Sequence, residues 1–264
     1  MTTNTEITRI QSYLREAARS QYQTVALPPF TLFFHPTDSF KYFNYAIPDE
    51  PCGGGLARPL DELRKAFYER GRTPRFEFYE AFAPDLPAAL KANGFDEEAR
   101  QWSMLCTPDT LRPVPDVLGI KVVALSEDSP EADMRDFLLT QRQGFDPENN
   151  TLPSDDEIRE LRSGIRASGY RSILARLNGE PASVASFGRP IHGVSEVAGI
   201  ATRVAYRRQG IATLLTYHAT RAAFEMGART ACLTAADEKA GRVYEKAGFQ
   251  PFSLMLAYID HDAA

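Results

Sequence analysis

In the second half of the chain, segments whose hydrophobic residues have the period of a helix alternate with segments that have the period of a strand. Apolar residues that recur every three to four positions predict helices, and short apolar or alternating runs between turn residues predict strands. On this basis we expect strands over 119–125, 170–177, 181–187, 195–203, 229–234 and 252–259, and helices over 129–143, 154–168, 210–226 and 237–247. This order of elements is typical of an α/β domain built around a mixed sheet.

Turn and capping residues mark the ends of several of these elements. Ser129 and Pro130 predict a helix start, because serine is a favoured N-cap and proline fits the first helical position. Asp237 predicts a second N-cap. Asn178 and Gly179 predict a tight hairpin turn between two strands.

The first half of the chain repeats part of this order. We expect helices over 60–70 and 84–92 and strands over 75–79 and 101–106. Both halves read helix–Gly–strand–helix–Gly-Phe–strand, with the two glycines 23 residues apart in the first half and 21 in the second. The shared order indicates a duplicated unit, with chance similarity as the alternative. Earlier aromatic residues predict strands in a core: Phe30, Phe33, Phe34, Tyr42 and Tyr45.

A proline-rich segment separates the two halves. Residues 107–119 read TPDTLRPVPDVLG, with three prolines and neither a helical nor an alternating period. Proline removes a backbone donor and favours extended conformations, so this segment reads as a linker. We place the boundary near Val117, which gives domains 1–116 and 117–264.

Composition narrows the classes of partner. The 264 residues, 43% hydrophobic and 25% charged, allow two domains with packed cores. A net charge of −5 without any basic run argues against nucleic acid. The first 23 residues are polar throughout and no run of about 18 apolar residues occurs, so we expect neither a signal peptide nor a membrane partner.

Cysteine and histidine spacing gives no sign of a disulfide framework or a metal site. Three well-separated cysteines, Cys52, Cys106 and Cys232, favour reduced thiols and a cytoplasmic location. The four histidines stand at no metal-ligand spacing, so no metal is predicted. His218 and Cys232 are interpreted as structural residues.

The segment RRQGIA, residues 207–212, joins a predicted strand to a predicted helix. Small residues at Gly210 and Ala212 allow the backbone to approach a ligand closely, and a helix start presents unpaired N–H groups and the positive end of the helix dipole. Arg207 and Arg208 add positive charge. Such a helix start suits a pyrophosphate, and a plain helix start is the alternative interpretation.

In this setting the segment resembles the cofactor motif of the GNAT family of N-acetyltransferases, [Q/R]-x-x-G-x-[G/A] between a strand and a helix. A second family pattern, N-x-x-A-x-x-x-Y-x-x-x-G-F, is matched by Asp237-x-x-Ala240-x-x-x-Tyr244-x-x-x-Gly248-Phe249. The aspartate departs from the usual asparagine, but both residues cap helices. The resemblance covers about residues 119–259. It implies the GNAT fold, with a mixed, mostly antiparallel sheet flanked by helices, preceded by a smaller degenerate GNAT-like domain.

The resemblance also implies acetyl-CoA as co-substrate and roles for particular residues. Tyr244 would protonate the departing CoA sulfur, and a tyrosine packed on its helix is the alternative. Glu196 would be the general base, often through water, with a solvent-facing glutamate as the alternative. A backbone N–H around residues 200–202 would hold the oxyanion. The residues expected to contact the cofactor are Ile200, Ala201, Thr202, Arg207, Arg208, Gln209, Gly210, Ile211, Ala212, Thr213 and Asp237.

The first half lacks these motifs. Residues 52–55, Cys-Gly-Gly-Gly, occupy the place of the pyrophosphate loop without its pattern, and Leu90 and Lys91 stand where the second half has Tyr244. We therefore expect a degenerate copy without cofactor.

The leading functional hypothesis is transfer of an acetyl group from acetyl-CoA to a primary amine of a small molecule or amino-acid-like substrate, by direct attack of the amine on the thioester. The alternatives are a protein or peptide N-acetyltransferase and a non-catalytic acyl-CoA-binding module. An acidic segment would favour a cationic amine, although a solvated loop is the preferred interpretation: Asp146, Glu148, Asp155 and Asp156. The sequence does not indicate an oligomeric state.

Overall fold

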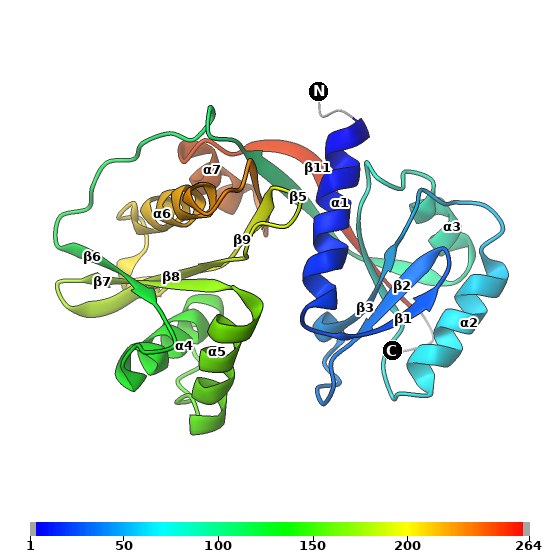
Figure 1. Ribbon diagram of the computed structural model, residues 1–264, viewed down its shortest axis with the longest axis horizontal. Coiled ribbons are helices and arrows are strands. Elements are labelled where there is room, and N and C mark those ends of the chain that lie inside the picture. Colours follow the sequence, from blue (N-terminus) through cyan, green and yellow to red (C-terminus); the bar gives the residue numbers. More distant parts are fainter. Residues whose placement is uncertain (1–3, 261–264) are drawn as a thin grey trace. The chain divides into compact units, whose positions relative to one another are not determined.

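The computed structural model describes residues 4–260 and divides the chain into two compact units (Figure 1). The N-terminal unit holds the residues up to Ser103 together with those from Pro251 onward, and the C-terminal unit holds Met104–Gln250. This division differs from the one expected at 116/117. His261 lies outside the described residues.

The N-terminal unit is a sheet with helices packed on it. Its strand order is β1-β2-β3-β4-β11-β5, so a strand from the C-terminal end of the chain lies between two strands of the first half. Residues 255–259 of β11 pair antiparallel with residues 75–79 of β4. Its elements are α1 (Asn4–Arg19), β1 (Gln23–Leu27), β2 (Phe30–Phe34), a 3₁₀ turn (Lys41–Phe43), β3 (Asn44–Pro48), α2 (Ala57–Tyr68), β4 (Arg75–Tyr79), α3 (Leu86–Ala92), β5 (Phe95–Cys106) and β11 (Gln250–Asp260).

Hydrophobic spacing explains the helices of this unit. Leu60, Leu63 and Phe67 recur at helical intervals on α2 and are buried. Helix α1 was not predicted, although Ile7 and Ile10 follow the same spacing and are buried. The prediction of core strands is confirmed for the aromatic residues in β2 and for Tyr45, but it is wrong for Tyr42, which lies exposed in the 3₁₀ turn.

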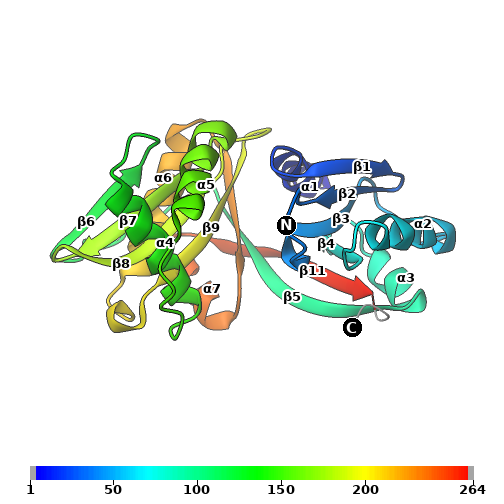
Figure 2. The same cartoon turned by 90° about the horizontal axis from the view of Figure 1, so that it is seen from below.

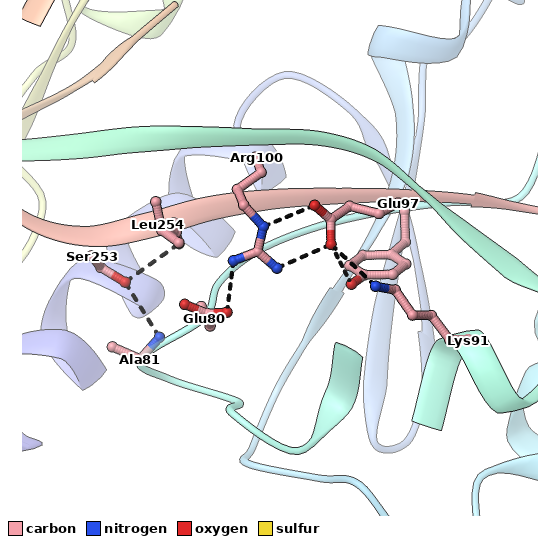
Figure 3. A network of polar contacts seen from close by, with 8 residues as sticks. Glu80, Ala81, Lys91, Glu97, Arg100, Ser253 and Leu254 are labelled. Carbon is pink, nitrogen blue, oxygen red and sulfur yellow. Dashed lines mark hydrogen bonds and ion pairs between the residues drawn. The ribbon is translucent and has the colours of Figure 1, made fainter. Parts of the chain in front are cut away.

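A polar network joins β5, β11 and the segment after β4 within this unit (Figure 3). Arg100 donates to both carboxylate oxygens of Glu97, at 2.8 and 3.0 Å, and to Glu80 at 3.0 Å. The hydroxyl of Tyr258 on β11 donates to Glu97 at 3.0 Å. These bonds hold the pKa of Glu97 down at about 2, first through Arg100. Charged groups at this end of the sheet therefore stabilise the unit to which they belong.

The C-terminal unit is a mixed, mostly antiparallel sheet, as predicted. From the end of β5 its strand order is β10-β9-β8-β7-β6; β10 and β9 are parallel, and the pairs from β9 to β6 are antiparallel. Its elements are β6 (Ile120–Leu125), α4 (Glu131–Phe145), α5 (Asp155–Ser168), β7 (Arg171–Leu177), β8 (Glu180–Phe187), β9 (Val194–Thr202), a 3₁₀ turn (Val204–Tyr206), α6 (Ile211–Glu225), β10 (Thr230–Ala235) and α7 (Glu238–Lys246).

Helices cover both faces of this sheet. Helices α4 and α5 lie on one face and α6 and α7 on the other (Figures 1 and 2). Each face has its own core: Phe137 and Ile158 belong to one, and Leu215 and Phe249 to the other. The end of β5 completes the second core, because Met104 and Cys106 are buried in it.

The cap predicted at Asp237 and the hairpin turn predicted at Asn178 and Gly179 are confirmed, whereas the cap predicted at Ser129 is wrong. Asp237 caps α7, and Ser154, for which no cap was predicted, caps α5 in a reciprocal capping box with Glu157. Asn178 and Gly179 take the left-handed conformation that their hairpin turn needs. Ser129 does not cap α4: Pro130 is the N-cap, and the Ser129 hydroxyl accepts from the Ser126 amide at 2.8 Å instead.

Residues 107–119 form neither helix nor strand, as expected of a linker, but they are bound to the C-terminal unit. The amide of Arg112 donates to the carbonyl of Ala247 at 3.1 Å, just after α7. Gly248 has φ +104°, and a Cβ there would stand 2.0 Å from the carbonyl oxygen of Thr110. The segment is therefore a packed part of this unit and not a free spacer.

Candidate functional site

Strands β9 and β10 separate in the middle of the C-terminal sheet. They pair at Val194 with Thr230, Ser195 with Ala231 and Glu196 with Cys232, and in the described residues no pairing between them follows. Strand β9 nevertheless continues to Thr202. Its backbone groups beyond Glu196 therefore face an edge that β10 does not occupy, which leaves donors for a ligand.

A bulge changes the direction of β9 within this open stretch. The register with β8 shifts between Val184 and Ser186, and Gly199 on β9 has φ +62°. A Cβ on Gly199 would lie 2.8 Å from Nε2 of Gln141 on α4, so only glycine fits there without a shift of that side chain. The bulge falls directly before Ile200, where the predicted oxyanion donors begin.

Helix α6 begins without a side-chain cap. Its N-cap is Gly210 at φ +81°, Arg208 is also left-handed at φ +61°, and the first intrahelical bond runs from the Leu214 amide to the Gly210 carbonyl at 3.0 Å. The amides of residues 211–213 have no acceptor within the helix. This start is the predicted pyrophosphate loop, and its free donors and helix dipole suit an anion.

The side chains around this loop divide into structural and free ones. Arg207 donates to the carbonyls of Thr202 at 3.0 Å and Gly144 at 2.8 Å, and so fixes the loop to the ends of β9 and α4. Gln209 makes a weak bond to the Ala205 carbonyl at 3.4 Å. Arg208 is exposed and makes no hydrogen bond or ion pair with any other described residue. Of the two arginines, only Arg208 keeps its guanidinium available.

The predicted residues of β9 lie on both faces of the sheet. Ile200 packs on the core under α6 and α7, whereas Ala201 is buried in the core under α4 and α5. The Thr202 hydroxyl interacts with that of Ser183 at 2.8 Å. Their side chains are therefore structural, and any contact with a ligand would come from the backbone.

Tyr244 lies on α7 in the core under α6 and α7, with 9% of its surface exposed. Burial raises the pKa of its hydroxyl, and the negative charge of Asp237 adds to the rise. The phenol therefore stays protonated at neutral pH and is able to donate a proton. Asp237 itself accepts from the Ala240 amide at 2.8 Å as the helix cap.

Glu196 is half-buried at the last paired position before β9 and β10 separate. Its neighbour Val197 points into the core under α6 and α7, so strand alternation directs Glu196 to the opposite face. The predicted acid Tyr244 and the predicted base thus belong to opposite faces of the sheet. This arrangement suits a reaction in which one group approaches a carbonyl from one side and another leaves on the other.

Other candidate residues have structural surroundings. His218 has a pKa lowered by burial, and Cys232 is buried on β10. In the acidic segment, Asp155 pairs with Arg135 and Asp156 with Arg159. Among residues 4–260 no group of histidine, cysteine and carboxylate side chains is arranged to hold a metal ion, and no helix is long and apolar enough to cross a membrane.

A cavity of about 340 Å³ lies beside the predicted pyrophosphate loop, and most of the residues in its wall were not predicted from the sequence. Gln209, Gly210 and Thr213 line one side, and the others are residues 113–117 and Lys246. The proline run indicated a linker, but nothing in its spacing signals that it folds back onto α6 and α7.

Solved structures similar to this one identify the fold, and a family model matches part of the sequence. Residues 133–249 match the acetyltransferase (GNAT) family. A GCN5-related N-acetyltransferase from Kribbella flavida has a similar structure, with 24% identity, coverage of 96% of this chain and 95% of that one, and a TM-score of 0.79. One from Sphaerobacter thermophilus has 16% identity, coverage of 95% and 84%, and a TM-score of 0.66. A tandem GNAT protein from the clavulanic acid biosynthesis pathway has 14% identity, coverage of 96% and 94%, and a TM-score of 0.60.

No curated protein matches the chain. The structural similarity extends over nearly the whole chain, whereas the family match covers residues 133–249, the part of the C-terminal unit that contains the uncapped helix start and Tyr244. The chain therefore has the GNAT fold, and its residues 133–249 match the acetyltransferase family of that name.

Proposed function

We propose that the chain is an acyl-CoA-dependent N-acetyltransferase that moves an acetyl group from acetyl-CoA to a primary amine of a small molecule or amino-acid-like substrate. The observation that carries this proposal is the start of α6, where three amides and Arg208 stand free beside the open edge of β9. A pyrophosphate bound there would leave the thioester arm to run along β9 toward Glu196. The GNAT family match over residues 133–249 supports the same assignment.

The surrounding residues fit the chemistry of acyl transfer. A neutral amine attacks the thioester carbonyl, so a C–N bond forms and the C–S bond breaks. Glu196 accepts the amine proton through water, and backbone N–H groups at Ile200–Thr202 stabilise the negative charge on the carbonyl oxygen. Tyr244 donates its proton to the departing thiolate. Because burial raises the pKa of Tyr244 while a thiol has a pKa of about 8.5, the transfer is uphill by itself; it is completed when the tyrosinate takes up a proton from water and Glu196 releases the amine proton to water.

The test is calorimetric titration of acetyl-CoA and free CoA into the wild-type protein and the Gly210→Glu variant. A carboxylate at the helix start would repel the pyrophosphate, so the variant should show no binding at high micromolar cofactor. Gly55→Glu is the matched control, because Gly55 is also left-handed, at φ +69°, and precedes a helix in the other unit. The proposal fails if the wild type does not bind, or if both variants bind as it does.

Cofactor binding alone does not distinguish the proposed enzyme from a non-catalytic acyl-CoA-binding module or from a protein acetyltransferase, so a second experiment is needed. A screen of small amines and of peptides, with CoA release as the readout, separates them. Release with small amines supports the proposal, release with peptides alone replaces the substrate class, and no release with any amine overturns the enzymatic part.

A further inference from the structure

One face of the sheet in the N-terminal unit changes from apolar to charged between β3 and β4. Over β2 and β3 the face is apolar, and Ala18 of α1 packs there with Phe33 and Ile47. The register of β3 with β4 places Arg75 and Glu77 on the same face, because side chains alternate along each strand. The face therefore serves packing under α1 and carries charges on the neighbouring strand.

A cavity of about 200 Å³ lies on the charged part of this face, and all the residues that line it belong to the N-terminal unit. Strand β4 contributes Arg75 and Glu77, β5 contributes Glu98 and Gln101, and the exposed Tyr42 also lines the cavity. At ~30 Å³ for each water, the cavity has room for roughly six waters, so it suits a molecule of a few heavy atoms. It is smaller than the sites that hold drug-sized ligands.

The guanidinium of Arg75 is buried and has one nitrogen that the protein leaves unused. Only 3% of the side chain is exposed. Its Nε donates to Glu98 at 2.5 Å and its Nη1 donates to Glu77 at 2.6 Å. Its Nη2 makes no hydrogen bond with another described residue and is not sealed from solvent. Because Arg75 lines the cavity, Nη2 opens into it and can donate to a carboxylate.

The acceptor opposite this donor is Glu77. One of its oxygens accepts from Arg75, and the other, Oε2, makes no hydrogen bond with another described residue. Glu98 is already fully paired, because one oxygen accepts from Arg75 and the other pairs with Lys41. Burial acts to raise the pKa of Glu98, but contacts with Lys41 and Arg75 lower it, so this carboxylate is charged at neutral pH. The cavity thus offers one free donor and one free acceptor, both on charged groups.

The balance of charge selects the class of ligand. Lys41 and Arg75 stand against Glu77 and Glu98, so the cluster is neutral before any ligand binds. A lone anion would meet two carboxylates, and a lone cation would meet an ammonium and a guanidinium, after either had lost its water. A molecule that carries both charges satisfies Nη2 of Arg75 with its carboxylate and Oε2 of Glu77 with its ammonium. Each of the two contacts is then a charge-assisted hydrogen bond.

We propose that this cavity is a binding site for a small zwitterionic amino acid, held by Arg75 at its carboxylate and by Glu77 at its ammonium group. Met255 and Ala257 of β11 also line the cavity and give an apolar surface for a short side chain. The site is separate from the proposed cofactor loop, since no residue of α6 takes part.

The experiment compares an amino acid with its two halves on the full chain. L-alanine carries both charges, propionate lacks the amine, and ethylamine lacks the carboxylate. Titrations followed by saturation-transfer difference NMR detect weak binding of each molecule. Alanine should bind at least about tenfold more tightly than either half, because each half leaves one charged partner without its hydrogen bond. This comparison uses the wild type, so it does not depend on the folding of a variant.

Glu77→Gln tests the assignment of the acceptor, because it keeps the shape of the side chain and removes its charge. The preference for alanine over propionate should fall about tenfold, since the ammonium group loses its charged partner and an anion meets one carboxylate fewer. Glu62→Gln is the matched control, on the exposed surface of α2, and should leave the preference unchanged.

Two further variants separate this site from the proposed active site. Alanine should bind to Glu196→Gln and to Gly210→Glu as it does to wild type. The inference is overturned if wild type does not bind alanine, if it binds either half as well as alanine, or if Glu196→Gln abolishes binding while Glu77→Gln does not. A wild type that binds alanine without acetyl-CoA binding refutes only the proposed function, and the reverse result refutes only this inference.

Discussion

Helix α6 in the C-terminal unit and helix α2 in the N-terminal unit both follow a left-handed glycine, Gly210 at φ +81° and Gly55 at φ +69°. Neither helix start has a side-chain cap. The two differ in what stands before them. Arg207 and Arg208 precede Gly210, whereas two acids and a half-buried thiol precede Gly55.

Electrostatics before α2 oppose an anion. The pKa of Cys52 is raised to about 11, first by burial and then by the negative charges of Glu50 and Asp49. The same field would repel a phosphate. Only Gly53 is closely packed, since a Cβ there would lie 2.4 Å from Cβ of Asp85, whereas the space beside Gly54 and Gly55 is open. We infer that the N-terminal unit keeps the arrangement of a helix after glycine without its use as a cofactor site, so glycine supplies geometry and the neighbouring charges decide the ligand.

The largest effect is expected when the two units are expressed as separate fragments. A fragment 1–116 lacks β11, whose buried Leu256 and Tyr258 lie between β4 and β5 in the N-terminal unit. Two such side chains contribute roughly 3–6 kcal/mol on burial, and the strand pairing lost on both sides of β11 adds to this, so the total loss is comparable to the 5–15 kcal/mol that typically stabilises a domain. We expect this fragment to lack a cooperative thermal transition by circular dichroism.

The complementary fragment 117–264 should fail for the matching reason. It lacks Met104 and Cys106, which complete the core under α6 and α7. The control is the whole chain cleaved at a protease site inserted near Val117 after folding, which keeps every strand and should melt as the intact chain does. Sharp melting of either fragment at the temperature of the intact chain would show that each unit folds on its own residues alone.

The next prediction concerns Tyr244, in whose place the first half of the chain has Leu90 and Lys91. Tyr244→Phe should lower kcat about 100-fold, the usual contribution of a general acid, with little change in the KM for acetyl-CoA. Because burial raises the Tyr244 pKa above 10, an acid in this position loses its proton only as pH rises beyond that value. The wild-type kcat should therefore show no alkaline decline from this group below pH 10.

Tyr68→Phe provides the control for this substitution. Tyr68 donates to Asp260 at 2.7 Å within the N-terminal unit, and its loss should leave kcat unchanged. Full turnover by Tyr244→Phe would instead establish the packed tyrosine that the sequence left as the alternative.

Elements with local signals could be predicted from the sequence, and the division into units could not. Strand β4 was predicted at its observed bounds, and α7 was predicted from its cap at Asp237. Pairing of β11 with β4 joins residues about 180 positions apart, and no local period reports such a partner. For the same reason the boundary at 116/117 followed the prolines, while the structure separates the units at Ser103 and Pro251.

The candidate site shows the same limit. The RxxGxA pattern identified the start of α6, because glycine and the helix signal are local. Lys246 and Val114 lie beside this helix start because residues 113–117 pack against it, and no hydrophobic period in the sequence encodes that contact. Ser129 was predicted to cap α4 from its residue type and the proline that follows it, yet its hydroxyl accepts a hydrogen bond from the Ser126 amide in a turn.

A smaller effect is expected when the N-cap of a helix is removed. Asp237→Ala should lower the free energy of unfolding by about 1 kcal/mol, because the Ala240 amide loses its acceptor. Asp237→Asn should retain most of that stability, since asparagine also caps. Chemical denaturation measures the loss.

Ser154→Ala is the matched variant on α5, where the same geometry exists away from the proposed cofactor loop. It should cost a similar free energy and leave acetyl-CoA affinity unchanged. If Asp237→Ala weakens cofactor binding while Asp237→Asn does not, the aspartate contributes to the cofactor site through the position of α7; equal stability of Asp237→Ala and wild type would contradict the capping role.

The smallest expected effect concerns charges that the N-terminal unit uses internally. The pKa of Glu97 is lowered to about 2 from 4.5, so its carboxylate stabilises the fold above pH 4.5 and loses that contribution as pH falls through about 2. Glu97→Gln should be less stable than wild type at pH 7, and the difference should narrow steadily between pH 4.5 and pH 2. Arg100 is 41% exposed at its side chain, so solvent screening keeps the effect small. Urea unfolding at pH 7, 4 and 3 measures the difference in stability between Glu97→Gln and wild type. Glu62→Gln, in the exposed pair with Arg58, is a control that should change nothing. A difference independent of pH would mean that Glu97 acts through packing, and the contrast with the free charge of Arg208 would then lose its electrostatic basis.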